Sequence, residues 1–196
     1  MDDDLALAQD LCARICHDLG GPLGSVTAAL DLLGQEPEAT EVARDGARIS
    51  TRRLHLWRVV AGAGGGPLGR QGIAELLDGA LPGGRTQPDV SGLPPEDLPA
   101  ETARAVLAAV MLGAEALPRG GVVHVAGTAN GLAVWPEGRN ASWPHALTAT
   151  LAGEAVSGPR EVLSPLLLRL AARAGLRMSL LLGQSAGCAP LMLQRG

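Results

Sequence analysis

The chain has 196 residues, 46% of them apolar, and a formal net charge of −4; it lacks Phe, Tyr and Lys, so all 16 basic residues are Arg. This length suits one large or two small domains with a core of Leu, Val and Ala. The negative charge gives no attractive field for nucleic acid, and we see no apolar run of membrane-spanning length and no secretory leader. We therefore expect a cytoplasmic protein without nucleic-acid or membrane partners.

A long helix is predicted from Leu5 to Gly34, because apolar residues recur about every 3.5 positions, the period of a helical-bundle seam. The seam comprises Leu5, Ala8, Cys12, Ile15, Leu19, Pro22, Val26, Ala29 and Leu33. With Cys12 at heptad position a, His17 falls at position f, which points away from the seam. The pattern therefore predicts an exposed histidine beside the carboxylate of Asp18.

The segment 34–37, Gly-Gln-Glu-Pro, is a helix stop signal, and a second helix is predicted from Glu38 to about Ala61. Its apolar residues repeat every seven positions at Val42, Ile49, Leu56 and Ala63. An antiparallel hairpin of two such helices cannot bury its seam alone. It needs a second domain or a second copy, and two hairpins make a four-helix bundle around a twofold axis.

The glycine-rich run 61–67 reads as a linker, so we expect a hairpin domain over 1–66 and a mixed α/β domain over 67–196. In this second domain we predict helices over 71–81, 100–117, 143–151 and 161–174, a strand over 87–90, a strand hairpin from 122–126 and 132–135, and a closing strand pair from 176–182 and 190–193 around the turn Gly-Gln-Ser-Ala-Gly.

The heptapeptide His-Asp-Leu-Gly-Gly-Pro-Leu at 17–23 resembles the phosphoacceptor box of histidine kinase dimerisation domains. Residues 106–114 are similar to the nucleotide-box helix of the kinase ATP-binding domain, but Ala109 and Gly113 stand where kinases use two asparagines. The adenine-reading Asp-x-Gly-x-Gly has no counterpart between Trp135 and Leu151, and segment 157–165 offers one glycine where the kinase lid has several. In this combination the chain resembles the ChpT family of bacterial histidine phosphotransferases.

The resemblance implies an α+β fold: a helical hairpin that forms a dimeric four-helix bundle, followed by a degenerate histidine-kinase ATPase-like α/β sandwich. It implies a homodimer in a two-component phosphorelay, which accepts a phosphoryl group from the receiver aspartate of a hybrid histidine kinase. That group would pass to response regulators of the cell-cycle type. No ATP, cofactor or resident metal is expected, because the receiver domain supplies Mg²⁺.

His17 is the expected nucleophile, since a neutral imidazole has a free ring nitrogen at cytoplasmic pH. Asp18 stands where related kinases place an acid that polarises the ring, and Arg14, one turn earlier, is expected to neutralise the bound phosphoryl group. For receiver docking we expect room from Gly20, Gly21 and Gly24, and positive charge from Arg48 and Arg52. These two belong to an arginine stripe with Arg44, for which a merely solvated face is the alternative.

Pro22 removes a helical hydrogen bond to the carbonyl of residue 18, which predicts either a docking kink or a tolerated bend. Two other functions stay open: an ATP-dependent sensor-type histidine kinase with a divergent nucleotide site, and a non-catalytic regulator that grips a receiver. A metal site of Cys12, Cys16 and His17 is disfavoured, because the ring and the thiols face different ways.

Overall fold

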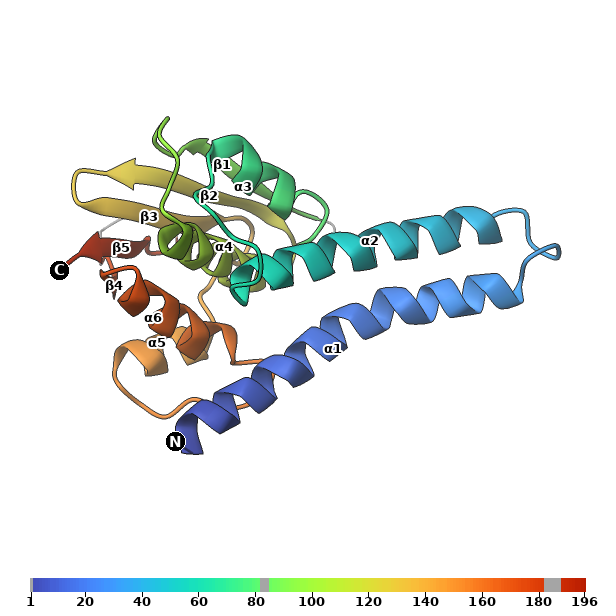
Figure 1. Ribbon diagram of the computed structural model, residues 1–196, viewed down its shortest axis with the longest axis horizontal. Helices are drawn as coiled ribbons and strands as arrows, with labels where there is room; N and C mark the ends of the chain where they lie inside the picture. The colour runs from blue at the N-terminus through green and yellow to red at the C-terminus, as the bar shows by residue number, and fades with distance from the viewer. Residues whose placement is uncertain (1, 82–84, 182–187) are drawn as a thin grey trace.

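The computed structural model describes residues 2–81, 85–181 and 188–196. The first two helices, α1 (Asp2–Asp31) and α2 (Ala39–Val60), pack antiparallel and extend as an arm from the rest of the molecule (Figure 1). The turn between them passes through Gly34, whose φ of 83° suits a residue without a side chain. The sequence thus predicted this hairpin and its turn correctly.

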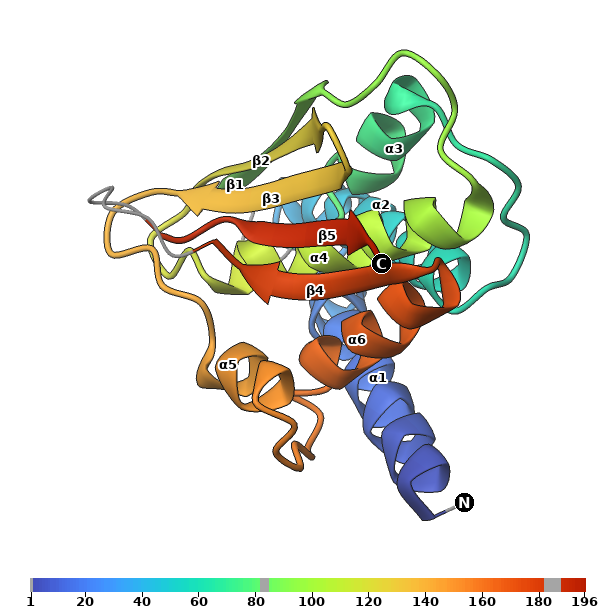
Figure 2. The ribbon, with the colours of Figure 1, turned by 90° about the vertical axis from the view of Figure 1, so that its left-hand side faces the viewer.

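The remaining elements form a mixed sheet with helices on one face. They are α3 (Arg70–Leu77), β1 (Thr86–Gly92), α4 (Ala100–Glu115), β2 (Gly121–Thr128), β3 (Gly131–Glu137), α5 (His145–Leu151), α6 (Leu163–Arg173), β4 (Leu176–Leu180) and β5 (Leu191–Arg195). The strand order is β1-β2-β3-β5-β4; only β1 and β2 pair in parallel, and α4 connects them. Figure 2 shows α4 and α6 behind the sheet, and none of the described helices covers its other face.

Helix α4 is the centre of the core, because it packs against the sheet, α6 and the end of α2. Apolar residues on nearly every side of α4 are buried, as expected for a helix enclosed by other elements. The C-terminal turns of α2 contribute Leu56, Trp57 and Val60 to the same core. The base of the hairpin and the second domain therefore share one hydrophobic core.

The predicted seam of α1 divides into two environments. Near its N-terminal half, Leu11 and Ile15 pack against the shared core of the second domain. Beyond His17, Val26 and Ala29 face α2 instead, with Ala29 buried. The interpretation of one uniform bundle seam was therefore wrong for Ile15, because the second domain occupies that side of α1.

Helix ends differ slightly from the predictions. The helix predicted to reach residue 81 ends at Leu77, where Asp78 turns extended and Gly79 adopts φ 63°. Pro22 lies inside α1 without ending it. The turn predicted between the last two strands falls at 183–187, outside the described residues. Within the described ranges, no helix combines the length and apolar character needed to cross a membrane.

Candidate functional site

His17 lies in the middle of α1 with 82% of its side chain exposed. It borders a cavity of about 730 Å³ between α1, the last residue of α4 and the segment before α6. The cavity is lined by Ala13, Arg14, His17, Asp18, Glu115, Pro159, Arg160 and Glu161. The imidazole is thus open to solvent on one side and faces charged residues on the other.

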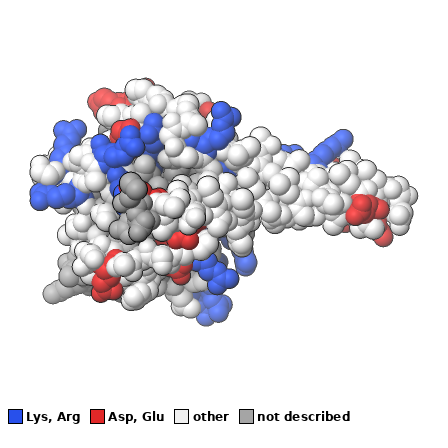
Figure 3. Space-filling model, turned by 60° about the horizontal axis from the view of Figure 1, so that its bottom comes forward, with Lys and Arg blue, Asp and Glu red and all other residues white. Residues whose placement is uncertain are grey.

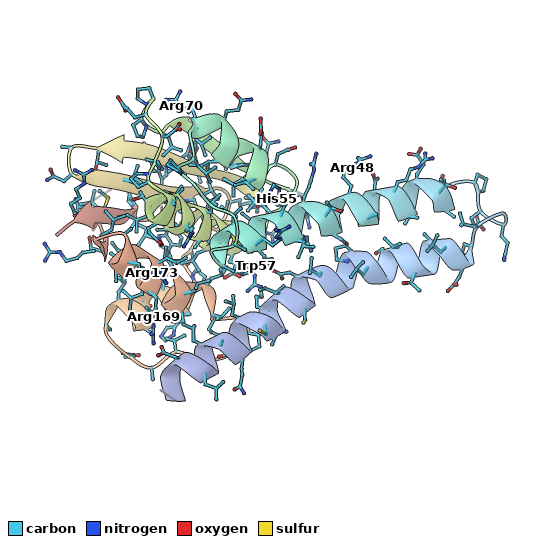
Figure 4. The ribbon with its side chains drawn as sticks, in the orientation of Figure 1. Arg48, His55, Trp57, Arg70, Arg169 and Arg173 are labelled. Atoms are coloured by element: carbon cyan, nitrogen blue, oxygen red, sulfur yellow. The ribbon has the colours of Figure 1, made fainter. Side chains whose placement is uncertain are left out.

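Asp18 is held in place beside the imidazole. Its Oδ1 lies 3.5 Å from Nδ1 of His17 and accepts a hydrogen bond from Nε of Arg14 at 3.0 Å. Its Oδ2 accepts one from Nε1 of Trp57 at 3.2 Å, and Figure 4 shows Trp57 between α2 and α1. A carboxylate facing Nδ1 favours the tautomer with the proton on Nδ1. The lone pair of Nε2 then points away from Asp18 and is available for chemistry.

Arg14 is 8% exposed, and each of its guanidinium nitrogens is engaged. Besides Asp18, it donates from Nη2 to Oε1 of Glu115 at 2.5 Å and from Nη1 to the carbonyl of Pro159 at 3.4 Å. Burial opposes its charge, but the two carboxylates outweigh burial and raise the pKa of Arg14. Burial also disfavours the charged form of Glu115 and so raises the pKa of this carboxyl group. The positive charge of Arg14 offsets only part of that increase. Arg14 therefore lies beneath His17 as part of an ion cluster, and its expected contact with a phosphoryl group stays a prediction.

The carbonyl freed by Pro22 finds a partner on the other helix. Pro22 has no N–H to donate to the carbonyl of Asp18 four residues earlier. Nη1 of Arg53 on α2 donates to that oxygen at 2.7 Å. The proline thus leaves a carbonyl oxygen without a helical donor behind the candidate site, and Arg53 of α2 donates to it.

The three glycines near His17 leave open space. A Cβ atom on Gly20, Gly21 or Gly24 would meet no atom within 4 Å. The helical period places Gly21 and Gly24 on the same face as His17, one and two turns further along α1. The structure therefore groups the imidazole with a smooth, accessible stretch of helix.

Arg48 and Arg52 lie apart from His17 and the three glycines. Gly46 faces α1, since a Cβ there would come 2.8 Å from Cγ2 of Val26. The helical period turns Arg48 to nearly the opposite side of α2, as Figure 4 shows. Arg48 pairs with Asp45 at 3.2 Å, and Arg52 pairs with Asp78 at 3.0 Å. Their role in docking stays a prediction, but within one chain they do not lie beside His17.

Four other residues shape the site and were not singled out from the sequence: Arg53, Trp57, Glu115 and Arg160. An antiparallel hairpin that turns near residues 35–37 brings residues from about 50 to 58 beside His17, and this was the available signal for Arg53 and Trp57. Glu115 and Arg160 come from distant segments, and no local pattern marks them. Arg160 is exposed, and its guanidinium forms no hydrogen bond or ion pair with the described part of the chain.

The two positions that correspond to the kinase asparagines are buried and have no room for a larger side chain. Ala109 is fully buried, and a Cβ on Gly113 would come 2.7 Å from Cγ1 of Val123 in β2. Cys12 and Cys16 are free and exposed. Among the described side chains, no group of three metal-ligating residues comes together.

The outer face of the sheet carries a second histidine cluster. Nδ1 and Nε2 of His124 lie 3.0 Å from carboxylate oxygens of Asp89 and Glu137, and its ring stacks on Trp135 with centroids 5.0 Å apart. Hydrogen bonds from Ser91, followed by His124, lower the pKa of Asp89 to about 2. Both ring nitrogens of His124 are occupied, so this cluster has no free nucleophile.

Comparisons with known proteins agree with the fold. The family model for the histidine phosphotransferase C-terminal domain matches residues 70–186. The protein phosphotransferase ChpT of Brucella abortus (strain 2308) is 38% identical over 64 residues, 31% of each chain, so the match spans about a third of that relative's length. A solved bacterial phosphotransferase has the same fold, with a TM-score of 0.76 and 24% identity over 95% of this chain and 94% of its own. Because the family model covers more than half of the chain, the protein belongs to the histidine phosphotransferase C-terminal domain family and is of the ChpT type.

Proposed function

We propose that this protein is a histidine phosphotransferase of a phosphorelay. It accepts a phosphoryl group on Nε2 of His17 from an aspartyl phosphate of a receiver domain, and passes it to the aspartate of a response-regulator receiver. The observation that carries this proposal is the exposed imidazole at the cavity, with a fixed carboxylate at Nδ1. The exposure gives a partner's active site access to the ring, while the carboxylate sets its tautomer.

The transfer step balances without any further reactant. The lone pair of Nε2 attacks phosphorus, a P–N bond forms, and the P–O bond to the receiver breaks with its electron pair leaving on the aspartyl carboxylate. The ring keeps its proton on Nδ1 and gains a positive charge, which the carboxylate of Asp18 stabilises. The second transfer is the reverse reaction on another receiver, whose acidic pocket supplies the Mg²⁺.

Arg160 is the guanidinium best suited to neutralise the bound phosphoryl group. It lines the same cavity as His17, and Arg14 is already shared between two carboxylates. The accessible stretch formed by Gly20, Gly21 and Gly24 accommodates a receiver helix next to the imidazole. Arg48 and Arg52 contact the receiver only if it also reaches the outer side of α2.

We infer that the hairpin pairs with that of a second copy to form a four-helix bundle. Large apolar side chains are exposed on its distal half, at Leu23, Leu30, Leu33, Val42 and Ile49. Figure 3 shows that the arm is mostly uncharged over the face turned to the viewer. Burying such a face against an identical one is the usual solution for a helical hairpin. The active form is therefore a homodimer.

The test is transfer of labelled phosphate from a phosphorylated receiver in the absence of ATP. The wild-type protein should take up label, His17→Gln should not, and His55→Gln should behave like wild type, because His55 is exposed on a different side of α2 from Trp57 (Figure 4). Equal labelling of His17→Gln and wild type contradicts the proposal. Labelling from ATP and Mg²⁺ alone would identify a kinase, whereas receiver binding without label would identify a non-catalytic regulator.

A further inference from the structure

Glu115 is an unusual residue for its position. It ends α4, where the negative end of the helix dipole disfavours a carboxylate, and its side chain is only 19% exposed. A charge held there at a cost in free energy needs a strong partner. That partner is Arg14 of α1, at 2.5 Å, and this contact joins the second domain to the turn that carries His17.

We propose that Glu115 is a positioning residue for the phosphoacceptor: by sharing the guanidinium of Arg14, it holds Asp18 in place and preserves the negative charge of Asp18 at Nδ1 of His17. The second domain thereby supplies part of the phosphoacceptor site. The inference rests on the proposed phosphotransfer at His17 and adds a residue from a different domain to it.

Geometry and charge support this role together. An Arg–Asp pair four residues apart on an isolated helix contributes little stability, so such a pair is not firmly fixed by itself. Glu115 and the carbonyl of Pro159 hold the other two nitrogens of Arg14, which leaves Nε directed at Asp18. The guanidinium approaches Asp18 in one orientation, and Trp57 fixes the other carboxylate oxygen.

The charge balance of the cluster has a direct chemical consequence. One cation lies between two carboxylates, so Arg14, Asp18 and Glu115 carry a net charge of −1 when all are ionised. If Glu115 were neutral, Arg14 would pair with Asp18 alone and cancel its charge. The imidazole gains positive charge as the P–N bond forms, so it needs the excess negative charge.

The decisive variant is Glu115→Gln, which keeps the shape and removes the charge. We expect phosphorylation of His17 by phosphoramidate, a small donor that needs no docking, to slow on the order of tenfold, the lower end of the range for groups that orient metal-binding histidines. We also expect ¹⁵N NMR to show a smaller population of the Nδ1-protonated tautomer of His17. Glu115→Asp retains the charge, and its rate should lie between those of Glu115→Gln and wild type.

The matched control is Glu101→Gln, which removes the carboxylate that Arg104 contacts in the first turns of α4, remote from His17. It should leave both the rate and the tautomer unchanged. If Glu115→Gln lowers thermal stability but matches the control in rate and tautomer, Glu115 only clamps the domains together and the inference is wrong. If wild type itself takes up no label on His17, the proposed phosphotransfer fails first; the tautomer measurement still decides the role of Glu115.

Discussion

The second domain buries its apolar side chains, whereas the distal half of the hairpin leaves large ones exposed to solvent. In α4 the apolar residues are buried on nearly every side, whereas the distal hairpin leaves Leu23 and Leu30 each 51% exposed. A helix enclosed by a sheet and other helices has no apolar surface left for a partner. The second domain thus buries its apolar residues within one chain, whereas the hairpin leaves His17 and large apolar side chains exposed.

The sharpest way to test this contrast is to place the same residue in both regions. Gly113→Asn should destabilise the protein by about 3 kcal/mol or more, because the side chain meets Val123 and its amide is buried without partners. Gly21→Asn should change stability by less than about 0.5 kcal/mol, because its side chain enters open space. Urea denaturation measures both; similar midpoints would mean that α4 is not enclosed as described.

A second test adds charge to exposed aliphatic residues of the two regions. Leu30→Glu combined with Ile49→Glu should raise the dimer dissociation constant at least about a hundredfold, equivalent to about 2.7 kcal/mol, since the carboxylates would enter an apolar interface. Leu168→Glu on α6, another exposed leucine, is the control and should leave the dimer intact. Sedimentation measures both. A wild-type protein that is monomeric at micromolar concentration would contradict the four-helix bundle.

Gly21→Ala tests why a poor helix former lies one turn from His17. The substitution should stabilise the protein by up to about 1 kcal/mol, because alanine favours the helix and its methyl group meets no atom. If the glycines provide room for a receiver, transfer from the receiver should slow while phosphorylation by phosphoramidate stays unchanged. Equal transfer rates would remove Gly21 from the docking surface. Thermal denaturation and both labelling assays give the answer.

The smallest effect concerns the sheet face that carries no helix. The lowered pKa of Asp89 means that its stabilising contribution is present above its ordinary pKa of 3.8 and is lost as the pH falls toward 2. The stability difference between wild type and Asp89→Asn should therefore shrink over this range. Because Asp89 is partly exposed, we expect this difference in the free energy of unfolding to stay below about 1 kcal/mol. Urea titrations at several pH values measure it, and a constant difference would contradict the Ser91 and His124 contacts.

Much of the fold could be predicted because it depends on local patterns. Heptad spacing gave the hairpin, the exposure of His17 followed from its heptad position, and glycine and proline marked the turns. The hairpin register also placed the correct part of α2 beside His17. The register did not show which side of α2 faces α1. In the structure Arg53 and Trp57 lie on the side that faces α1, whereas Arg48 and Arg52 do not.

The ion cluster could not be predicted, for a different reason. Arg14 lies near His17 on the helical surface, which suggested a solvent-facing cation. Its burial depends on Glu115, about a hundred positions away in sequence, and on the carbonyl of Pro159. Such contacts follow from the tertiary packing of segments far apart in the sequence, and no periodicity within either segment encodes them.

Pro22 has a consequence for amide hydrogen exchange. It interrupts the hydrogen-bond ladder of α1 one turn after Asp18, so the two halves of the helix are not joined by an unbroken series of protected amides. The first half packs Leu11 and Ile15 on the second domain, while the second half faces α2 through Val26. The distal half should therefore open and exchange as a separate cooperative unit, with lower protection. Arg53 keeps the carbonyl of Asp18 occupied during such opening, so the turn bearing His17 can remain folded while the tip of the hairpin unfolds.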